Sequence, residues 1–132
     1  MIGYVTLGVS NMERAKNFYV ELLKDKGASV LIDMDRIAFI GKSMDQPMIA
    51  VCIPFNEEPN HPGNGNMLGF NAGSRENVDK MYERAISLGA TDDGPPGPRI
   101  PEYNGVVYDD VVFYGAYFKD ADGNKAVFYK LG

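Results

Sequence analysis

The sequence of 132 residues contains a single cysteine, Cys52. One cysteine cannot form an intramolecular disulfide, so the sequence predicts a protein of a reducing compartment, and we expect it in the cytoplasm. Two further features are missing: an apolar run long enough to span a membrane, and an N-terminal basic segment followed by an apolar core. The sequence therefore predicts neither a membrane span nor a signal peptide.

Basic clusters are also missing, and the formal charge of −5 is spread along the chain. Proteins that bind nucleic acid or anionic membranes through electrostatic attraction present such clusters. We therefore expect no nucleic acid and no membrane as partner, and instead a small molecule or another protein chain. Apolar residues make up 45% and charged residues 23% of the sequence, which is typical of a single globular domain at this length.

The first half of the chain predicts a strand, a helix and further strands. Residues 2–9 alternate between apolar and other side chains, as in a half-buried strand. Ser10 precedes Glu13 by the spacing of a capping box, and apolar residues then recur at helical intervals. A helix is therefore predicted over about 11–25, with Ser10 as its N-cap. Short strands are predicted at SVLID, RIAFIG and MIAVCIPF.

The second half repeats this order after NEEPNHPGNG, which is rich in Pro, Gly and Asn and is predicted to be a linker. MLGFNA predicts a strand, and Ser74 predicts the N-cap of a helix that ends at Gly89. A Pro/Gly-rich loop is predicted at DDGPPGPRIPEYNG, a strand at VVFYGAYF, a turn at DADGN and a strand at KAVFYKL. A shift of 63 residues, from Tyr19 to Tyr82, superimposes the two halves, which indicates an internal repeat.

These features together resemble the vicinal oxygen chelate superfamily, which includes glyoxalases, extradiol dioxygenases and bleomycin-resistance proteins. The resemblance rests on the opening strand with NMERAKNFY, on the paired βαβββ halves and on KDADGNKAVF, and it covers nearly the whole chain. It implies an α+β fold of two tandem βαβββ modules whose sheets form a half-barrel around a pocket, commonly completed in a homodimer. The implied single domain consists of module 1 (1–56), a linker (57–65) and module 2 (66–132).

Superfamily members with metal chemistry hold the ion through one residue on each of four strands, usually His, Gln or Glu. Matched one by one, these positions fall on Tyr4, Ala50, Met67 and Val127. Alanine and valine have no donor atom, and a thioether is too soft for zinc, nickel, manganese or iron(II). Tyrosine binds a metal only as phenolate, which its ordinary pKa of ~10 disfavours. With these departures, the resemblance predicts no metal and no cofactor.

Without a metal, the implied pocket would bind its ligand through aromatic and cationic side chains. Several tyrosines are expected to offer ring faces, and Arg99 a guanidinium for an anion or carboxylate. The predicted ligand-binding residues are Tyr4, Ala50, Met67, Arg99, Tyr103, Tyr114, Tyr117 and Val127. The alternative for each tyrosine is an ordinary strand residue with a buried ring, and for Arg99 a solvated loop residue.

Three other candidate sites have plainer interpretations. His61 lies near two glutamates in the linker, but the spacing matches no metal site, so a solvated loop histidine is predicted. DADGN resembles the start of a calcium loop, yet its glycine comes at the fourth place and no glutamate closes the loop, so a β-turn is predicted. Cys52 has no histidine near it in the sequence, and a buried inert thiol is predicted.

Two classes of function remain open. The first is a metal-free protein that binds a small aromatic or weakly anionic molecule, much as bleomycin-resistance proteins bind a drug without metal. The second is a glyoxalase-type lyase or isomerase, or a dioxygenase-related enzyme, in which Tyr4 and Arg99 would act as acid and oxyanion partner. Loss of a metal removes transition-state stabilisation on the order of several kcal/mol. Binding is therefore the preferred interpretation.

Overall fold

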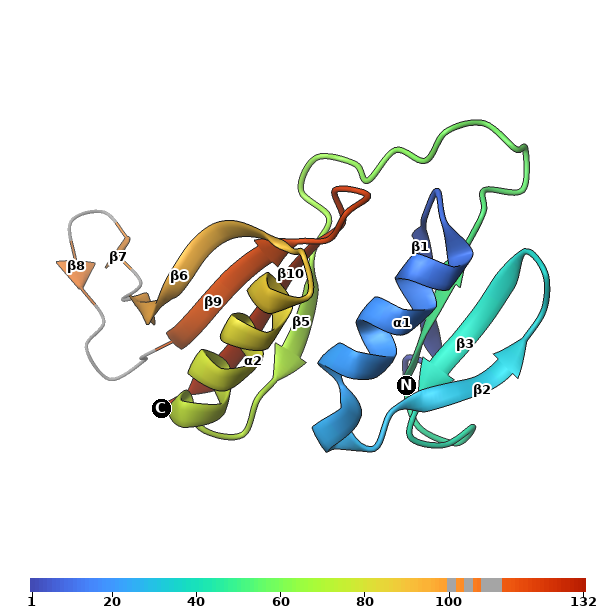
Figure 1. Ribbon diagram of the computed structural model, residues 1–132. Coiled ribbons are helices and arrows are strands. Elements are labelled where there is room, and N and C mark those ends of the chain that lie inside the picture. Colours follow the sequence, from blue (N-terminus) through green and yellow to red (C-terminus); the bar gives the residue numbers. More distant parts are fainter. Residues whose placement is uncertain (100–101, 104–105, 108–112) are drawn as a thin grey trace. The chain divides into compact units, whose positions relative to one another are not determined.

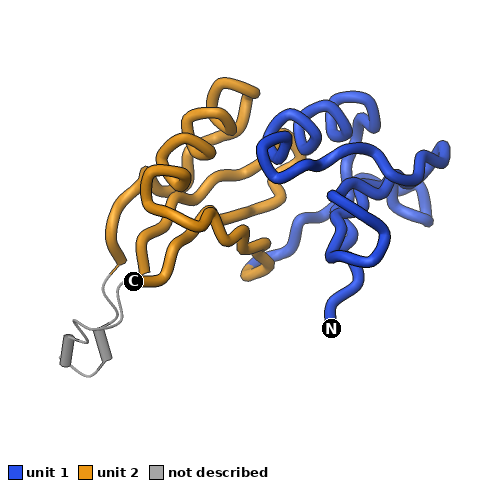
Figure 2. The backbone as a smooth tube through the Cα atoms, turned by 90° about the horizontal axis from the view of Figure 1, so that it is seen from below, with its two compact units in different colours: residues 1–64 blue, residues 65–132 orange. Residues whose placement is uncertain are grey.

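The computed structural model describes residues 1–99, 102–103, 106–107 and 113–132. The chain divides into two compact units, Met1–Asn64 and Gly65–Gly132, which Figure 2 shows in blue and orange. Each unit has one α-helix lying on a four-stranded sheet (Figure 1). The predicted α+β fold of two tandem βαβββ modules is therefore confirmed.

Unit 1 consists of β1 (Tyr4–Gly8), α1 (Met12–Leu22), a short 3₁₀ helix (Lys24–Lys26), β2 (Ser29–Asp33), β3 (Ile37–Gly41) and β4 (Met48–Cys52). The strand order is β1-β4-β3-β2, with β1 parallel to β4 and the other pairs antiparallel. The helix packs against β2, β3 and β4. Apolar side chains of both layers form the core of this unit, among them Leu7, Val9, Phe18, Tyr19, Leu22, Ile40 and Val51.

The start of α1 differs from the prediction, because Asn11 and not Ser10 is the N-cap. The Asn11 side-chain oxygen accepts a hydrogen bond from the Arg14 amide at 3.0 Å. The Ser10 hydroxyl instead accepts a hydrogen bond from the Arg14 guanidinium, also at 3.0 Å. Serine and asparagine are equally good caps by type, so the sequence pattern did not decide between neighbours. The helix also ends at Leu22, because the chain tightens into the 3₁₀ helix that Gly27 ends at φ 80°.

Unit 2 repeats this order with β5 (Leu68–Asn71), α2 (Arg75–Ser87), β6 (Thr91–Arg99), β9 (Phe113–Lys119) and β10 (Lys125–Leu131). A separate two-stranded ribbon pairs β7 (Glu102–Tyr103) with β8 (Val106–Val107). The order in the larger sheet is β5-β10-β9-β6, with β5 parallel to β10, and α2 packs on β6, β9 and β10.

The predicted N-cap of the second helix is confirmed, since the Ser74 hydroxyl accepts a hydrogen bond from the Asn77 amide at 3.1 Å.

Neither α1 nor α2, nor any other helix in the described ranges, is long and apolar enough to cross a membrane.

The loop predicted at DDGPPGPRIPEYNG is wrong in its described part. Glu102–Tyr103 form β7, residues 100–101 and 104–105 lie outside the described ranges, and residues 92–99 belong to β6. This strand pairs antiparallel with β9 although it contains Pro95, Pro96 and Pro98. It lies at the edge of the sheet, and its register shifts on both sides of Gly94. Proline donates no amide hydrogen bond but is tolerated at edges and bulges, so a composition typical of a loop can form this strand.

The predicted turn at DADGN joins β9 to β10. One carboxylate oxygen of Asp120 accepts hydrogen bonds from the amides of Asp122 and Asn124, both at 2.9 Å. The Asn124 side chain donates to the other oxygen at 3.0 Å, and both residues are buried. The carboxylate of Asp120 therefore organises the turn through donors within the turn itself.

Candidate functional site

Strand pairing in unit 1 brings two of the four superfamily ligand positions onto one face of the sheet. Thr6 of β1 is opposite Ala50 of β4, and Tyr4 lies two residues before Thr6. Because side chains alternate along a strand, these residues share a face. Tyr4 is 53% exposed and its ring packs edge-on against Phe39 at a centroid distance of 5.0 Å, whereas Ala50 is fully buried. A ligand on this face would therefore meet the Tyr4 ring.

Unit 2 has the same register. Gly69 of β5 is opposite Val127 of β10, and Met67 lies two residues before Gly69. Met67 is 47% exposed, whereas Val127 is 2% exposed. In each unit, therefore, the first of the two positions is open to solvent and the second is buried. A shared register of this kind is what an internal repeat requires.

The side chains at these four positions do not fit a divalent metal ion. Two are hydrocarbon and buried, one is a thioether, and one is a neutral phenol that would have to lose its proton. Within residues 1–99, 102–103, 106–107 and 113–132, no three His, Cys, Asp or Glu side chains gather into a metal-binding group. No reaction step through a metal can be derived from these positions.

Three aromatic rings cover the face of the unit 2 sheet that carries Val127. Tyr117 is directly opposite Val127 in the β9–β10 ladder, and Tyr129 is opposite Gly115. Phe113 and Tyr129 stack at a centroid distance of 5.4 Å and an interplanar angle of 13°. We call Phe113, Tyr117 and Tyr129 the aromatic platform. All three residues are half-buried, so each keeps part of its surface open to solvent.

The rings of the aromatic platform lie close against the backbone because glycines stand beneath them. A Cβ atom at Gly115 would be 2.5 Å from Cε1 of Phe113. A Cβ atom at Gly94 would be 3.1 Å from Cδ2 of Tyr117. A larger residue at either position would push the ring outward, so the glycines allow the close approach of ring and sheet.

Two cations flank Tyr117. Cζ of Arg99 lies 5.5 Å and Nζ of Lys125 lies 5.4 Å from the centroid of its ring. Lys125 is paired with Asp93 at 3.0 Å. Arg99 has no carboxylate partner within the described ranges, and its Nη2 donates to the carbonyl oxygen of Pro95 at 2.7 Å. Arg99 therefore presents a positive charge that no described acid neutralises.

Tyr114 faces the opposite side of the same sheet. Its hydroxyl donates to Asp79 of α2 at 2.7 Å, and Cζ of Arg75 lies 5.1 Å from its ring centroid. The hydrogen bond to Asp79, together with burial, raises the pKa of Tyr114. Tyr103 lies in β7, outside the four-stranded sheet. Of the predicted residues in unit 2, the sheet therefore groups Arg99, Tyr117 and Val127 on one face and places Tyr114 on the other.

Three residues of this face were not predicted: Phe113, Tyr129 and Lys125. All three lie in phase with Tyr117 or Val127 along their strands, which is a weak sequence signal. The signal becomes specific only once the register of β9 against β10 is known. The predicted burial of Cys52 and the predicted exposure of His61 are also confirmed.

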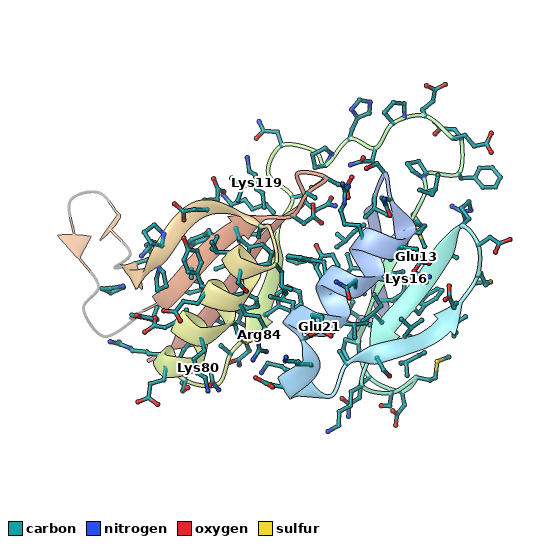
Figure 3. The ribbon with its side chains drawn as sticks, viewed as in Figure 1. Glu13, Lys16, Glu21, Lys80, Arg84 and Lys119 are labelled. Atoms are coloured by element: carbon teal, nitrogen blue, oxygen red, sulfur yellow. The ribbon has the colours of Figure 1, made fainter. Side chains whose placement is uncertain are left out.

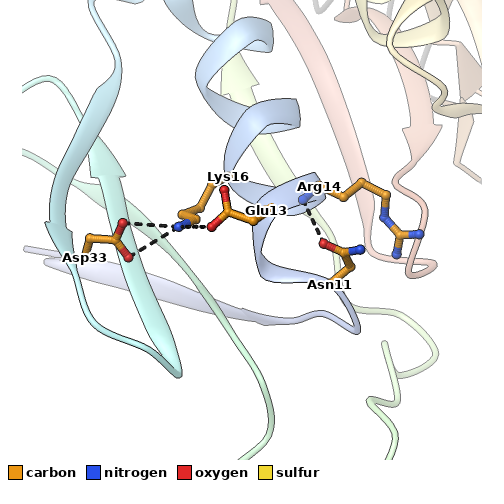
Figure 4. A network of polar contacts seen from close by, with 5 residues as sticks. All are labelled: Asn11, Glu13, Arg14, Lys16 and Asp33. Carbon is orange, nitrogen blue, oxygen red and sulfur yellow. Dashed lines mark hydrogen bonds and ion pairs between the residues drawn. The ribbon is translucent and has the colours of Figure 1, made fainter.

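A shallow hollow of about 340 Å³ lies between α1 and β2, lined by Glu13, Lys16, Asn17, Val20, Val30 and Asp33. Glu13 and Lys16 project from α1 in Figure 3, and Figure 4 shows the contacts that they make there. Nζ of Lys16 lies 2.7 Å from Glu13 and 3.1 Å from Asp33, and the hydrogen bonds to these two carboxylates raise the pKa of Lys16. Its charge is therefore already neutralised, and the hollow offers no free cation.

Residues 1–128 match the family model described as Glyoxalase/Bleomycin resistance protein/Dioxygenase superfamily. Among curated proteins, no sequence matches the chain significantly.

Solved structures resemble the chain over nearly its whole length. A glyoxalase/bleomycin resistance protein from Albidiferax ferrireducens is 31% identical with a TM-score of 0.79, and the match covers 97% of each chain. A glyoxalase/bleomycin resistance protein/dioxygenase family enzyme from Burkholderia phytofirmans is 18% identical with a TM-score of 0.72, covering 96% of this chain and 95% of the other. A fosfomycin resistance protein from Mesorhizobium loti is 18% identical with a TM-score of 0.67, covering 98% and 90%. The last two show likeness of fold.

Proposed function

Because the chain belongs to the glyoxalase/bleomycin resistance protein/dioxygenase superfamily, we propose that it binds a small aromatic or weakly anionic molecule without a metal ion. The chemistry of the four ligand positions carries this proposal. They are occupied by Tyr4, Ala50, Met67 and Val127, and thus offer neither imidazole nor carboxylate. Binding would then depend on the aromatic and cationic side chains that share the same sheet faces.

These faces carry groups suited to a small planar molecule. Unit 1 offers the exposed ring of Tyr4 beside Phe39, and unit 2 offers the aromatic platform beside Arg99. Aromatic rings provide large contact areas, and a guanidinium binds a carboxylate through two parallel hydrogen bonds. The proposal includes a homodimer, since homodimers are common in the superfamily. It also includes a cytoplasmic location, which the single cysteine favours.

The enzymatic alternative is a glyoxalase-type lyase or isomerase, or a dioxygenase-related enzyme, with Tyr4 as the acid. A general acid or base normally has a neighbour that adjusts its pKa or accepts its proton. The Tyr4 hydroxyl has no hydrogen-bond partner among the described residues, and its ring contacts the apolar Phe39. This environment favours binding over proton transfer.

The first test is elemental analysis of the purified protein, followed by thermal unfolding with zinc, nickel, manganese or iron(II) salts and with EDTA. We expect no stoichiometric metal, no rise in Tm on metal addition and no fall with EDTA, because the four positions lack donors. A stoichiometric metal whose removal lowers Tm and whose return restores it would contradict the metal-free proposal.

The second test is thermal unfolding with a panel of small aromatic and weakly anionic compounds. A ligand that binds only the folded state stabilises it by about 2.7 kcal/mol at a hundredfold excess over Kd, so Tm should rise. Tyr4→Phe tests the phenol and Arg99→Ala tests the guanidinium, with Arg75→Ala as a control on the opposite face. Equal rises in all variants would remove Tyr4 and Arg99 from the site, and no rise with any compound would contradict the binding function.

A further inference from the structure

We propose that the ligand is a planar aromatic anion and that unit 2 recognises both of its parts. The aromatic platform of Phe113, Tyr117 and Tyr129 would stack against the ring, and Arg99 would pair with the anionic group. This inference rests on the proposed binding function. It makes that function more specific, because it places the aromatic ring and the anionic group in one ligand molecule and assigns the recognition of both to unit 2.

The sheet face of unit 1 lacks a partner for an anion. Its register groups uncharged residues on the face of Tyr4: Tyr4, Thr6 and Gly8 of β1, Met48, Ala50 and Cys52 of β4, and Ile37 and Phe39 of β3. An anion placed there would lose water without gaining a positive partner, which is costly. The anionic part of the ligand is therefore assigned to the other unit.

Positive charge gathers on the corresponding face of unit 2. Arg99 and Lys125 both lie within 5.5 Å of the Tyr117 ring centroid. Lys119, which Figure 3 labels, is the last residue of β9. It is directly opposite Lys125 in the β9–β10 ladder. In the part of the chain that the structure describes, only Lys125 among these three cations has a carboxylate partner, Asp93. The face therefore has an excess of positive charge beside its aromatic surface.

The guanidinium of Arg99 is held in place before any ligand binds. Its Nη2 donates to the Pro95 carbonyl at 2.7 Å, and its Nη1 donates to the Pro98 carbonyl at 3.4 Å. It also lies over Gly97, where a Cβ atom would be 3.0 Å from Nη1. A guanidinium has five N–H donors, so these contacts leave donors for an anion. Because the side chain is already ordered, binding costs less conformational entropy.

The aromatic platform lies where it can support a flat ring. Phe113 and Tyr129 stack nearly parallel to each other, and Tyr117, four residues after Phe113 on the same face of β9, is the ring that Arg99 and Lys125 flank. A neutral aromatic compound could stack on this surface but would leave Arg99 unpaired. An aliphatic carboxylate could pair with Arg99 but would gain little from the rings. A planar aromatic anion uses both features.

The test titrates the full-length chain with three probes, 2-naphthoate, its neutral amide 2-naphthamide, and cyclohexanecarboxylate, followed by NMR of the backbone amides. We expect 2-naphthoate to bind at least tenfold more tightly than either of the other probes. The largest chemical-shift changes should occur around Gly94, Gly115 and Tyr117, because aromatic ring currents act at short range.

Variants separate the two contributions. Arg99→Gln should weaken 2-naphthoate about tenfold and leave 2-naphthamide unchanged, whereas Tyr117→Leu should weaken both aromatic probes. Arg75→Gln is the matched control, since Arg75 lies over Tyr114 on the opposite face in a similar cation–π geometry. If Arg99→Gln lowers the unfolding midpoint strongly, Arg99→Lys keeps the charge and should retain most of the preference for the anion.

The outcomes distinguish this inference from the proposed function. Equal affinity for 2-naphthoate and 2-naphthamide, or shifts confined to residues around Tyr4, overturns the assignment of an anion to unit 2 and leaves small-molecule binding in place. An equal loss in Arg99→Gln and Arg75→Gln overturns the role of Arg99. No binding of the probes, together with no response to the wider compound panel, overturns the proposed function itself.

Discussion

Two tyrosine–aspartate pairs connect α2 to the sheet of unit 2, each through one hydrogen bond. Tyr82 of α2 donates to Asp92 of β6, and Tyr114 of β9 donates to Asp79 of α2, each at 2.7 Å. Burial and then the hydrogen bond to Asp92 raise the pKa of Tyr82 to about 12. The same bond, together with the amide of Gly94, lowers the pKa of Asp92. The contribution of the Tyr82–Asp92 hydrogen bond to stability therefore depends on pH, because both groups must keep their present protonation states.

Tyr82 should ionise later than the exposed tyrosines. Its pKa in the folded state lies above the unfolded value of ~10, so its stabilising contribution is complete below that value and is lost as pH rises through about 12. NMR of the tyrosine Cζ carbons against pH measures this directly. The variant Tyr82→Phe should also raise the pKa of Asp92 toward its ordinary value. A Tyr82 signal that moves together with those of exposed tyrosines would contradict the prediction.

Gly115→Ala should destabilise the fold, because the new Cβ atom would be 2.5 Å from the Phe113 ring. Overpacking of this kind typically costs about 1–3 kcal/mol of the free energy of unfolding, which exceeds the ~0.5–1 kcal/mol that alanine gains over glycine in a strand. Urea unfolding measures the difference. Gly3→Ala is the control, since nothing lies within 4 Å of its Cβ position, and equal stabilities of the two variants would contradict the packing argument.

The two helices begin in the same manner, although only the start of α2 was predicted correctly. Ser74 caps α2 as its type and position indicate, whereas α1 is capped by Asn11. The capping box from Ser10 to Glu13 fits the sequence pattern equally well. What decides is the extended backbone of Asn11, at φ −141° and ψ 108°, which directs its side chain to the Arg14 amide.

Alanine substitutions at the helix starts should rank in a definite order. Asn11→Ala and Ser74→Ala should each lower the free energy of unfolding by about 0.5–2 kcal/mol, because each removes the acceptor of an end amide. Ser10→Ala should cost clearly less, since the Ser10 hydroxyl contacts the exposed Arg14 side chain. Urea unfolding of the three variants compares them. A larger loss of unfolding free energy for Ser10→Ala than for Asn11→Ala would indicate that Ser10 is the N-cap of α1.

Local sequence patterns predicted most helices and strands. The strand β6 and the aromatic platform depend on contacts between strands that are distant in the sequence. Apolar periodicity was enough for both helices and for the strand KAVFYKL, which is β10 without a change of bounds. The strand β6 was missed because its prolines and glycines indicate a loop, and its place at a sheet edge is a tertiary property. The aromatic platform was only partly predicted for the same reason. Phe113 and Tyr129 meet only when β9 pairs with β10.

The chain consists of two compact units whose boundary, after Asn64, falls within the predicted linker 57–65. This segment is mostly exposed. Two hydrogen bonds at its start are local: the Glu57 amide donates to the Pro54 carbonyl at 2.9 Å, and the Glu58 amide donates to the Asn56 side chain at 3.0 Å. Glu57 adopts φ 62°, a left-handed conformation that is uncommon outside glycine. The segment is therefore a connection whose length we expect to be tolerant of change.

Insertion of Gly-Ser-Gly-Ser between Gly63 and Asn64 should change the free energy of unfolding by less than about 1 kcal/mol, because doubling the length of a flexible loop costs only ~0.6 kcal/mol. The same insertion between Ala121 and Asp122 is the comparison. There it would disrupt the hydrogen bonds of the buried Asp120, and it should cost at least about 2 kcal/mol. Equal losses at the two places, measured by urea unfolding, would show that the linker is structurally constrained.

The prolines of β6 also have a consequence for self-association. A free sheet edge can recruit a strand from another molecule and so begin fibre growth or strand exchange. Three of the nine residues of β6 carry no amide hydrogen, and its register is broken on both sides of Gly94. A foreign strand would find few regular donors along this edge. The proline and glycine content that led to the prediction of a loop should therefore protect unit 2 from aggregation at its β6 edge.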